Sequence, residues 1–424
     1  MTIYYLRVNF SKYKCNSLKI IDEYVIFTDL HKNKIITLDT HDITYLDCSN
    51  NNLTNLDNFK DFINMETLLC HNNQLNTIPE YPNLAELICF NNKLTSIPFY
   101  PKLEVLNCRH NDFTNLDNYN SYSSIEVLDC IVNKLYKLPE FPNITKLYCS
   151  YNKLETIPFY KNLEILYCGN NKITKINPYD NLKELVCNSN LITELPQECT
   201  KLEVLDFSDN NITSIPNYPN LKILNCSKTN FTDFPKMKNL TSLNCSYNNY
   251  QILPNPIKVP NLRTLNCSNN NLSEIPFYPL IKNLKCSYNK INEIPQFNYL
   301  EKLICDNNII RTLDSYVYLK QLNCSYNMLT QIPIIPTLLY LDCRNNMITE
   351  IPEFDDIVYI NCSFNQLSKL PKYKKIEKLT TNNNIKELPF NKSNSKNKKN
   401  FINKFNDVLD YIPYLLPYYH NQHF

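Results

Sequence analysis

Cysteine is the residue whose spacing along this 424-residue chain is most regular, and its thiol could carry chemistry. It returns at positions 48, 70, 89, 108, 130, 149, 168, 187, 226, 245, 267, 286, 305, 324, 343 and 362. Phe207 fills the one missed place and Thr381 closes the series; steps are of 19 residues, except three of 22 and one of 20. Such a row of thiols could be a metal store, a redox device or part of a buried core.

The linear arrangement of the cysteines favours the third of these roles, packing in a buried core. Zinc prefers a tetrahedral ligand set, which a linear row does not offer, and the series contains no Cys-x-x-Cys pair. Neighbouring cysteines in a parallel sheet would lie about 4.8 Å apart, wider than the roughly 3.8 Å between the Cβ atoms of a relaxed disulfide. Buried thiols are also poorly ionised. We therefore expect no metal site and no cofactor, and we assign no role to Cys15 or Cys199, which lie outside the series.

Two further patterns could suggest catalysis. Cys70 and His71 look like a nucleophile with its base, but strand alternation would point their side chains to opposite faces. His110 would lie two strands further on, about 10 Å away. The terminal pair, His420 and His423, could bind a metal only weakly. We expect no catalytic residues and a protein that is not an enzyme.

Each cysteine belongs to a Leu-x-Cys alternation, which is typical of a strand with one buried face. The Asn three residues later, such as Asn152, is expected to bond backbone groups of neighbouring turns. An Ile-Pro or Leu-Pro pair follows, such as Ile97-Pro98, and it predicts extended, polyproline-like backbone with at most a 3₁₀ turn. Glycine occurs once, at Gly169, so turns that need left-handed backbone must use Asn.

This pattern resembles the leucine-rich repeat family. Its L-x-x-L-x-L-x-x-N-x-L motif is present as Leu163-Glu-Ile-Leu166-Tyr-Cys168-Gly-Asn-Asn171-Lys-Ile173. The short repeat resembles the bacterial type, and Cys in place of the third Leu resembles repeat proteins of large DNA viruses, or giant viruses, and some protists. The resemblance implies a leucine-rich-repeat solenoid in the form of a horseshoe or arc. A parallel β-sheet would line its concave face and extended or 3₁₀ segments its convex face, with little α-helix.

The expected organisation has four parts. Residues 1–25 form an N-terminal cap, and residues 26–390 form about 18 coils, beginning with a degenerate one at His31 to Leu38. Residues 391–400 form a polar, basic linker. Residues 401–424 contain a short amphipathic helix, which either covers the last coil or contacts a partner or a membrane surface. Its apolar positions recur at helical spacing: Phe401, Ile402, Phe405, Val408, Leu409 and Ile412.

The net charge and the lengths of the apolar runs restrict the class of partner and the expected location of the protein. A net charge of +2 argues against a nucleic-acid binder. The chain starts without a secretion-signal pattern and has no run of about 18 apolar residues, so we expect no stable membrane insertion. An intracellular, reducing location is expected, in the cytoplasm, or in the host cytoplasm if the protein is viral. The repeated Asn-Cys-Ser sequons, such as Asn225 and Asn244, should then carry no glycans.

A protein partner is the remaining expectation, because exposed apolar and aromatic side chains are enriched at interfaces. The columns beside the cysteines are richest in such residues between positions 69 and 186, and polar afterwards. We predict a non-enzymatic protein–protein interaction scaffold that binds its partner on the concave face. The alternative is a substrate-receptor subunit of a ubiquitin-ligase or signalling assembly; the oligomeric state is open. The predicted contact residues are Leu69, Ile88, Phe90, Ile131, Val132, Tyr148, Tyr151, Ile165, Tyr167 and Val186.

Overall fold

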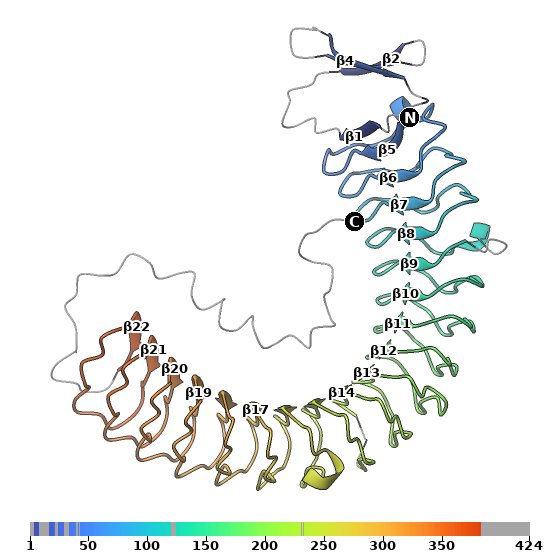
Figure 1. Cartoon of the computed structure of the whole chain (residues 1–424). Helices are drawn as coiled ribbons and strands as arrows, with labels where there is room; N and C mark the ends of the chain where they lie inside the picture. Colours follow the sequence, from blue (N-terminus) through green and yellow to red (C-terminus); the bar gives the residue numbers. More distant parts are fainter. Residues whose placement is uncertain are drawn as a thin grey trace. The chain divides into compact units, whose positions relative to one another are not determined.

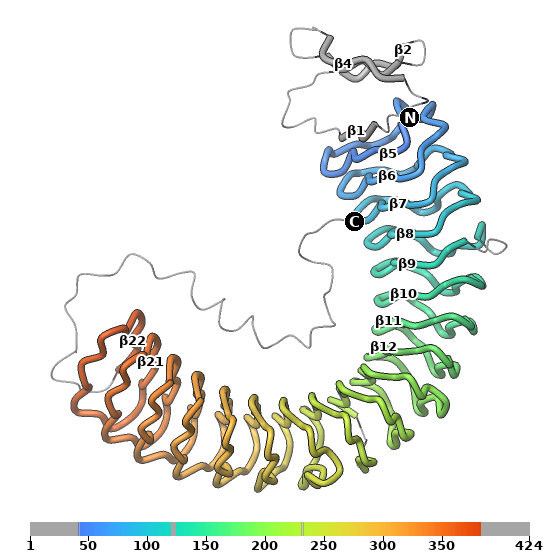
Figure 2. Tube along the Cα trace, in the orientation of Figure 1, coloured from blue at the N-terminus to red at the C-terminus, as the bar shows by residue number. Residues whose placement is uncertain are grey.

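The computed structural model of the chain describes residues 4–7, 17–21, 24–28, 34–39, 41, 43–119, 124–229, 231 and 233–382. The chain divides into two compact units (Figure 1). The first is Met1–Leu272 with Pro276–Ile281, and the second is Ser273–Ile275 with Lys282–Phe424. Figure 2 traces the backbone of both units as stacked coils. The predicted linker at 391–400 and the segment 401–424 lie outside the described residues.

Parallel strands run through both units, one strand to each coil. In the first unit β5 to β16 pair in sequence order, and in the second unit β17 to β22 do the same. The strands of the first unit are β5 Ile43–Asp47, β6 Thr67–Leu69, β7 Glu86–Ile88, β8 Val105–Asn107, β9 Val127–Asp129, β10 Lys146–Tyr148, β11 Ile165–Tyr167, β12 Glu184–Val186, β13 Val204–Asp206, β14 Ile223–Asn225, β15 Ser242–Asn244 and β16 Thr264–Asn266. Those of the second are β17 Asn283–Lys285, β18 Lys302–Ile304, β19 Gln321–Asn323, β20 Tyr340–Asp342, β21 Tyr359–Asn361 and β22 Lys378–Thr380.

The N-terminal strands differ from the coils. β1, Tyr4–Arg7, pairs parallel to β5. β2 (Ser17–Ile21), β3 (Tyr24–Thr28) and β4 (Lys34–Asp39) form a separate antiparallel sheet. The segment expected to begin the coils therefore pairs antiparallel to β3 instead. The role of residues 1–25 as a cap, and the boundary at residue 25, stay predictions.

Each coil closes around a column of apolar side chains. The middle residue of a strand, such as Leu147, is fully buried, and so is the cysteine two residues later, such as Cys149. Burial of a leucine side chain is worth about 1.5–3 kcal/mol, so the repeated columns supply most of the stabilisation. All the described cysteines are buried, and none of them forms a disulfide. Burial raises the pKa of the Cys48 thiol to about 12, which leaves it protonated at neutral pH.

Asparagine side chains join successive coils, as the repeat predicts. Asn152 Nδ2 donates to the carbonyls of Cys149, in its own coil, and Cys130, in the preceding coil, at 3.0 Å each. Its Oδ1 accepts the Leu135 N–H at 2.9 Å. The same three contacts recur in the next coil at Asn171. The asparagine ladder therefore satisfies backbone groups that have no strand partner.

A second ladder lies on the opposite side of the coil and was not anticipated from the sequence. Two residues after the Ile-Pro pair a buried tyrosine donates its hydroxyl proton to the proline carbonyl of the preceding coil. Tyr160 bonds Pro139 at 2.8 Å, and Tyr179 bonds Pro158 at 3.0 Å. Cys199 takes the tyrosine place in its coil, because its carbonyl accepts the Leu202 N–H as tyrosine carbonyls do elsewhere. Cys199, one of the two cysteines outside the series, is therefore also a packing residue.

The three steps of 22 residues also have a structural explanation. Each contains a short 3₁₀ helix: η2 at Asp57–Phe59, η3 at Asp117–Tyr119 and η4 at Pro256–Lys258. The extra residues are thus taken up between strands, and the strand register is kept on both sides. No helix among the described residues is long and apolar enough to cross a membrane.

Candidate functional site

The contact residues predicted from the sequence lie on or beside the open face of the sheet in the first unit. In the three-residue strands β6 to β21 the middle residue is buried in the core, so the first and third residues point to the open face. The residue directly after each cysteine lies on the same face. Leu69, Ile88, Tyr148, Tyr167 and Val186 hold the third strand position of β6, β7, β10, β11 and β12, and Ile165 the first position of β11. Phe90 and Ile131 each follow a cysteine.

An aromatic and cationic cluster lies at the start of this face. The rings of His71 and Phe90 stack with centroids 4.3 Å apart and planes 6° apart. On the other side, Arg109 Cζ lies 4.6 Å from the Phe90 ring centroid, within cation–π range. Burial lowers the pKa of His71, which is therefore neutral at pH 7. Cys70 is fully buried while His71 lies on the open face, as strand alternation predicts.

A second aromatic cluster lies further along the face. Tyr148 and Tyr167 meet edge to face with centroids 5.1 Å apart, and the Tyr167 hydroxyl donates to Glu184 Oε2 at 2.7 Å. Tyr167 is only 7% exposed and Val186 only 4%. These two predicted contact residues therefore support their neighbours, and Tyr148, which is half-buried, offers the accessible ring.

The single glycine of the chain lies beside this second cluster. A Cβ placed on Gly169 would come within 2.2 Å of Asn188 Oδ1. A side chain at this position would require the Asn188 side chain of the next coil to move. The backbone angle of Gly169 is not in the left-handed region, so the sequence-based association of glycine with turns does not apply to it.

A buried carboxyl group lies between the two clusters. Asp129, the last residue of β9, is 8% exposed, and its Oδ1 accepts the Ile131 N–H at 3.2 Å. Burial raises the pKa of Asp129 to about 6, although the hydrogen bond and the nearby Arg109 guanidinium oppose the rise. The charge of this carboxyl thus changes close to neutral pH.

Two predicted contact residues lie at the edge of the sheet. Val132 (φ 54°) and Tyr151 (φ 57°) have left-handed backbone, two residues after a cysteine. Tyr151 is 57% exposed. The same conformation recurs in every coil, most often at an asparagine, as expected, but also at several tyrosines. The side chains of this column leave from the turn that follows the strand.

The remainder of the face in the first unit is polar and bonded internally. Asp206 Oδ1 accepts the Ser208 hydroxyl proton at 2.6 Å, and Asp206 Oδ2 accepts from Asn225 Nδ2 at 2.9 Å. Asn244 likewise accepts the N–H and hydroxyl of Ser246. The sequon Asn225 is 6% exposed, so it is a buried hydrogen-bonding residue rather than a surface acceptor. These polar side chains therefore already have hydrogen-bond partners within the protein.

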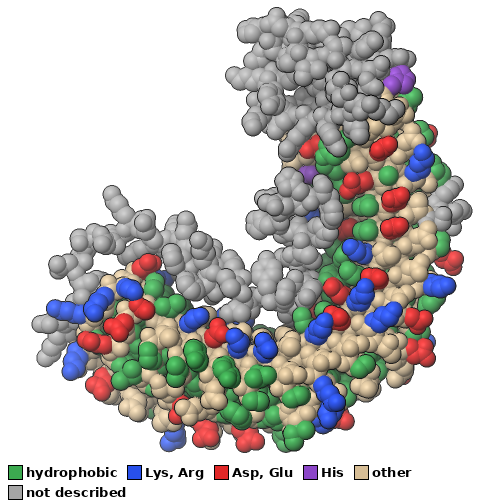
Figure 3. All heavy atoms as spheres, viewed as in Figure 1, with side chains coloured by type: hydrophobic (Ala, Val, Ile, Leu, Met, Phe, Trp, Pro, Cys, Tyr) green, Lys and Arg blue, Asp and Glu red, His purple; other side chains and the backbone are tan. Residues whose placement is uncertain are grey.

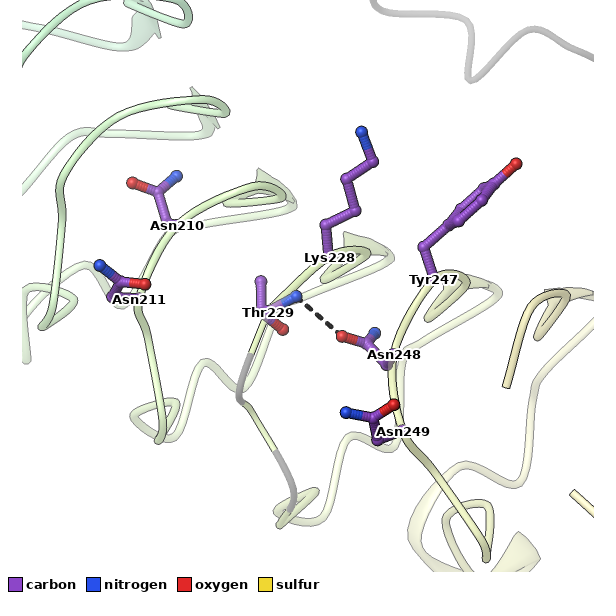
Figure 4. A pocket seen from close by; sticks show the side chains of 7 residues that line it. All are labelled: Asn210, Asn211, Lys228, Thr229, Tyr247, Asn248 and Asn249. Atoms are coloured by element: carbon purple, nitrogen blue, oxygen red, sulfur yellow. Dashed lines mark hydrogen bonds between the residues drawn. The ribbon is translucent and has the colours of Figure 1, made fainter. Parts of the chain in front are cut away.

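A polar hollow of about 290 Å³ lies at the edge of the coils where the asparagine ladder is interrupted (Figure 4). Thr229 replaces the ladder asparagine, and its hydroxyl donates to the Cys226 carbonyl at 2.9 Å and accepts the Phe231 N–H at 3.5 Å. Lys228 and Tyr247 extend away from the backbone at the rim in Figure 4. Among the described residues, no group of three or more His, Cys, Asp or Glu side chains could hold a metal ion. The lining residues are Asn210, Asn211, Lys228, Thr229, Tyr247, Asn248 and Asn249.

Comparisons with known proteins agree with this architecture. A family model described as Leucine Rich repeats (2 copies) matches residues 142–181, and one described as Leucine Rich Repeat matches residues 201–219 and 261–283. These segments contain leucine-rich repeats, and the fold is a leucine-rich-repeat solenoid. No curated protein sequence matches it.

Solved structures provide more extensive matches. The leucine-rich effector YopM from Yersinia pestis is 26% identical with a TM-score of 0.63, and the match covers 79% of this chain and 88% of that one. YopM from Yersinia enterocolitica is also 26% identical, with a TM-score of 0.59 and coverages of 80% and 78%. The functional domain of InlJ from Listeria monocytogenes, which includes a cysteine ladder, is 25% identical with a TM-score of 0.60 and coverages of 79% and 76%. The particular bacterial or giant-virus type stays a prediction.

Proposed function

We propose that this protein is a non-enzymatic interaction scaffold that binds a protein partner on the open face of the sheet, the predicted concave face, between β6 and β12. Leucine-rich-repeat folds commonly mediate protein–protein interaction, because stacked strands offer a long continuous surface. A reducing, intracellular location is part of the proposal. The partner is a protein rather than a nucleic acid, since the net charge is only +2.

The observation that carries the proposal is the contrast along the face. Between β6 and β12 the face holds the His71–Phe90–Arg109 stack and the Tyr148–Tyr167 pair. From β13 to β16 of the same unit the third strand positions and the residues after the core position are aspartate, asparagine and serine, several of which bond one another. Aromatic residues and arginine are the side chains most enriched among binding hot spots. The first stretch therefore has the composition of an interface, and the second has that of a solvated surface.

The test removes apolar side chains from the proposed surface. Phe90, Ile131 and Tyr148 are replaced together by serine, and proteins crosslinked to the tagged chain in cells are quantified by mass spectrometry. The proposal expects a set of proteins that is captured by the unmodified chain and lost from this variant. A matched control replaces Phe159, Ile252 and Phe277 with serine; these side chains are 59%, 78% and 48% exposed and lie away from the open face.

The control variant should keep every captured protein, and both variants should keep the unfolding midpoint of the parent within a few degrees. Loss of the same proteins from both variants would point to a general effect of lower hydrophobicity. Unchanged capture by the Phe90, Ile131 and Tyr148 variant would reject the proposed surface.

A further inference from the structure

An exposed apolar strip in the second unit lies outside the proposed binding surface. It consists of residues that follow four consecutive strands, β18 to β21, and we call it the flank strip. Figure 3 shows hydrophobic side chains gathered over the coils of this unit. The members of the flank strip are Ile309, Tyr326, Met328, Met347 and Phe364, which are 43%, 48%, 39%, 43% and 61% exposed.

Backbone hydrogen bonds place these residues on neighbouring coils. The Met328 N–H donates to the Ile310 carbonyl and the Met347 N–H to the Leu329 carbonyl, at 2.9 Å each. Ile309, Met328 and Met347 therefore follow one another at the strand spacing of about 4.8 Å. Tyr326 and Phe364 have left-handed backbone two residues earlier in their repeats, so they border the same row.

The first unit does not carry this feature. The positions equivalent to Met328 are Lys93, Asp112, Lys134, Lys153 and Lys172 in five consecutive coils. Lysine, aspartate and asparagine are the usual residues there, and Leu191 is the exception, with 55% exposure. Three consecutive apolar residues, two of them methionine, are thus specific to the second unit. Methionine is a frequent contact residue on surfaces that accept apolar helices.

The chain itself contains a segment of matching chemistry. Residues 401–412 carry Phe401, Phe405, Val408 and Ile412 on one face if they adopt a helix. A helix of twelve residues is about 18 Å long, and the flank strip covers three strand spacings, about 14 Å. If residues 383–400 behave as a flexible chain, their root-mean-square span is roughly 23 Å, enough to reach from β22 back to β18. A tether of this length gives an effective concentration in the millimolar range.

We infer that residues 401–412 bind the flank strip of the same molecule as an amphipathic helix. The end of the last described coil is the competing surface. There Leu370, Ile376 and Leu379 are each only half-buried, while Thr381 replaces the ladder cysteine. The flank strip offers five exposed apolar side chains, and it lies within the unit to which the segment belongs. By occupying the strip, the segment would shield it from association with other proteins.

The chain has no tryptophan, which makes a clean fluorescence probe available. Phe405→Trp in the full-length chain places one indole on the apolar face of the segment. The inference predicts blue-shifted emission that is independent of protein concentration, and a quenching constant with acrylamide several-fold below that of the denatured chain. Adding Met328→Lys and Met347→Lys should shift the emission to the red and raise the quenching constant to the denatured value.

The matched control is Leu191→Lys, which adds a lysine at the equivalent position in the first unit and should leave the emission unchanged. Both methionines are substantially exposed, so the double variant should keep the unfolding midpoint of the parent. Red-shifted emission in the Phe405→Trp chain itself would overturn the inference. So would a blue shift that persists after the lysine substitutions, because the segment would then bind elsewhere, such as the last coil. A blue shift that grows with concentration would indicate a second copy and would also overturn it.

Discussion

Among the described residues, the position two places after each cysteine of the regular series has positive φ, and valine is the least suited of the residues found there. Val132 has φ 54°. A β-branched side chain in left-handed backbone is an outlier, because its Cβ crowds the neighbouring carbonyl oxygen. Strained residues of this kind cluster at functional sites. Val132 lies beside the proposed binding surface. We therefore attribute the valine at this position to partner binding, because it does not favour the stability of the fold.

Replacing Val132 with asparagine should therefore stabilise the protein and weaken partner binding. We expect the free energy of unfolding to rise by about 1 kcal/mol, since the left-handed penalty is of that order. Urea unfolding measures the change. The converse control is Asn170→Val at φ 55°, which should lose about as much stability. A Val132→Asn variant no more stable than the parent would contradict the strain argument.

Asp129 predicts a pH dependence. Its folded-state pKa, about 6, lies above its ordinary value of 3.8, so the folded state holds the proton more tightly than the unfolded state. Stability is therefore lost as pH rises from 4 through 6. Asp129→Asn cannot ionise, and Asn244 shows that asparagine at this position accepts the same backbone N–H.

The Asp129→Asn variant should exceed the parent in unfolding free energy by about 2–3 kcal/mol at pH 7.5, and the gain should shrink towards zero at pH 4. Urea unfolding at the two pH values gives both numbers. Equal stabilities of parent and variant at pH 7.5 would show that burial does not penalise the Asp129 charge.

At the scale of the element, the asparagine ladder is the feature that joins one coil to the next. Asn152→Ala removes four hydrogen bonds and leaves the carbonyls of Cys130 and Cys149 without this donor. We expect a loss of about 2–3 kcal/mol, because stranded buried polar groups keep their desolvation cost. Lys153→Ala, an exposed neighbour, should change stability by less than about 0.5 kcal/mol. Similar effects of the two substitutions on thermal unfolding would count against the ladder.

The sequence predicted elements well where one residue type recurs at a fixed position. The strand around Leu147, the buried Cys149 and the bonding of Asn152 all follow from the Leu-x-Cys and Asn pattern. The tyrosine–proline ladder does not follow from the sequence pattern, because an Ile-Pro pair indicates extended backbone but not which residue the proline carbonyl will bond. Tyr160 and Pro139 belong to successive repeats, so their bond is visible only once the coils are stacked.

The candidate site was predicted less fully, because exposure depends on neighbours in other coils. Alternation places Tyr167 and Val186 on the open face, yet packing between strands buries both of them. His71 and Arg109 belong to the site because both contact the ring of Phe90, which lies between them. Such contacts between repeats are not encoded in the spacing of any one repeat.

In the molecule as a whole, each unit carries a different proposed binding surface. The first unit holds the proposed partner surface on its open face, and the second unit holds the flank strip for residues 401–412. Each assignment rests on a departure from the consensus repeat: aromatic residues beside the cysteines in one unit, and Ile309, Met328 and Met347 in the other. Positions that depart together in neighbouring coils form surfaces, whereas isolated departures such as Leu191 do not.

Hydroxyl-radical footprinting of the complex with a captured partner tests the central claim most directly. Partner binding should lower the oxidation rates of Phe90 and Tyr148 several-fold. It should leave Tyr247 and Phe277, 58% and 48% exposed, at their rates in the free chain. Unchanged oxidation of Phe90 and Tyr148, with protection of Tyr247 or Phe277 instead, would contradict the account.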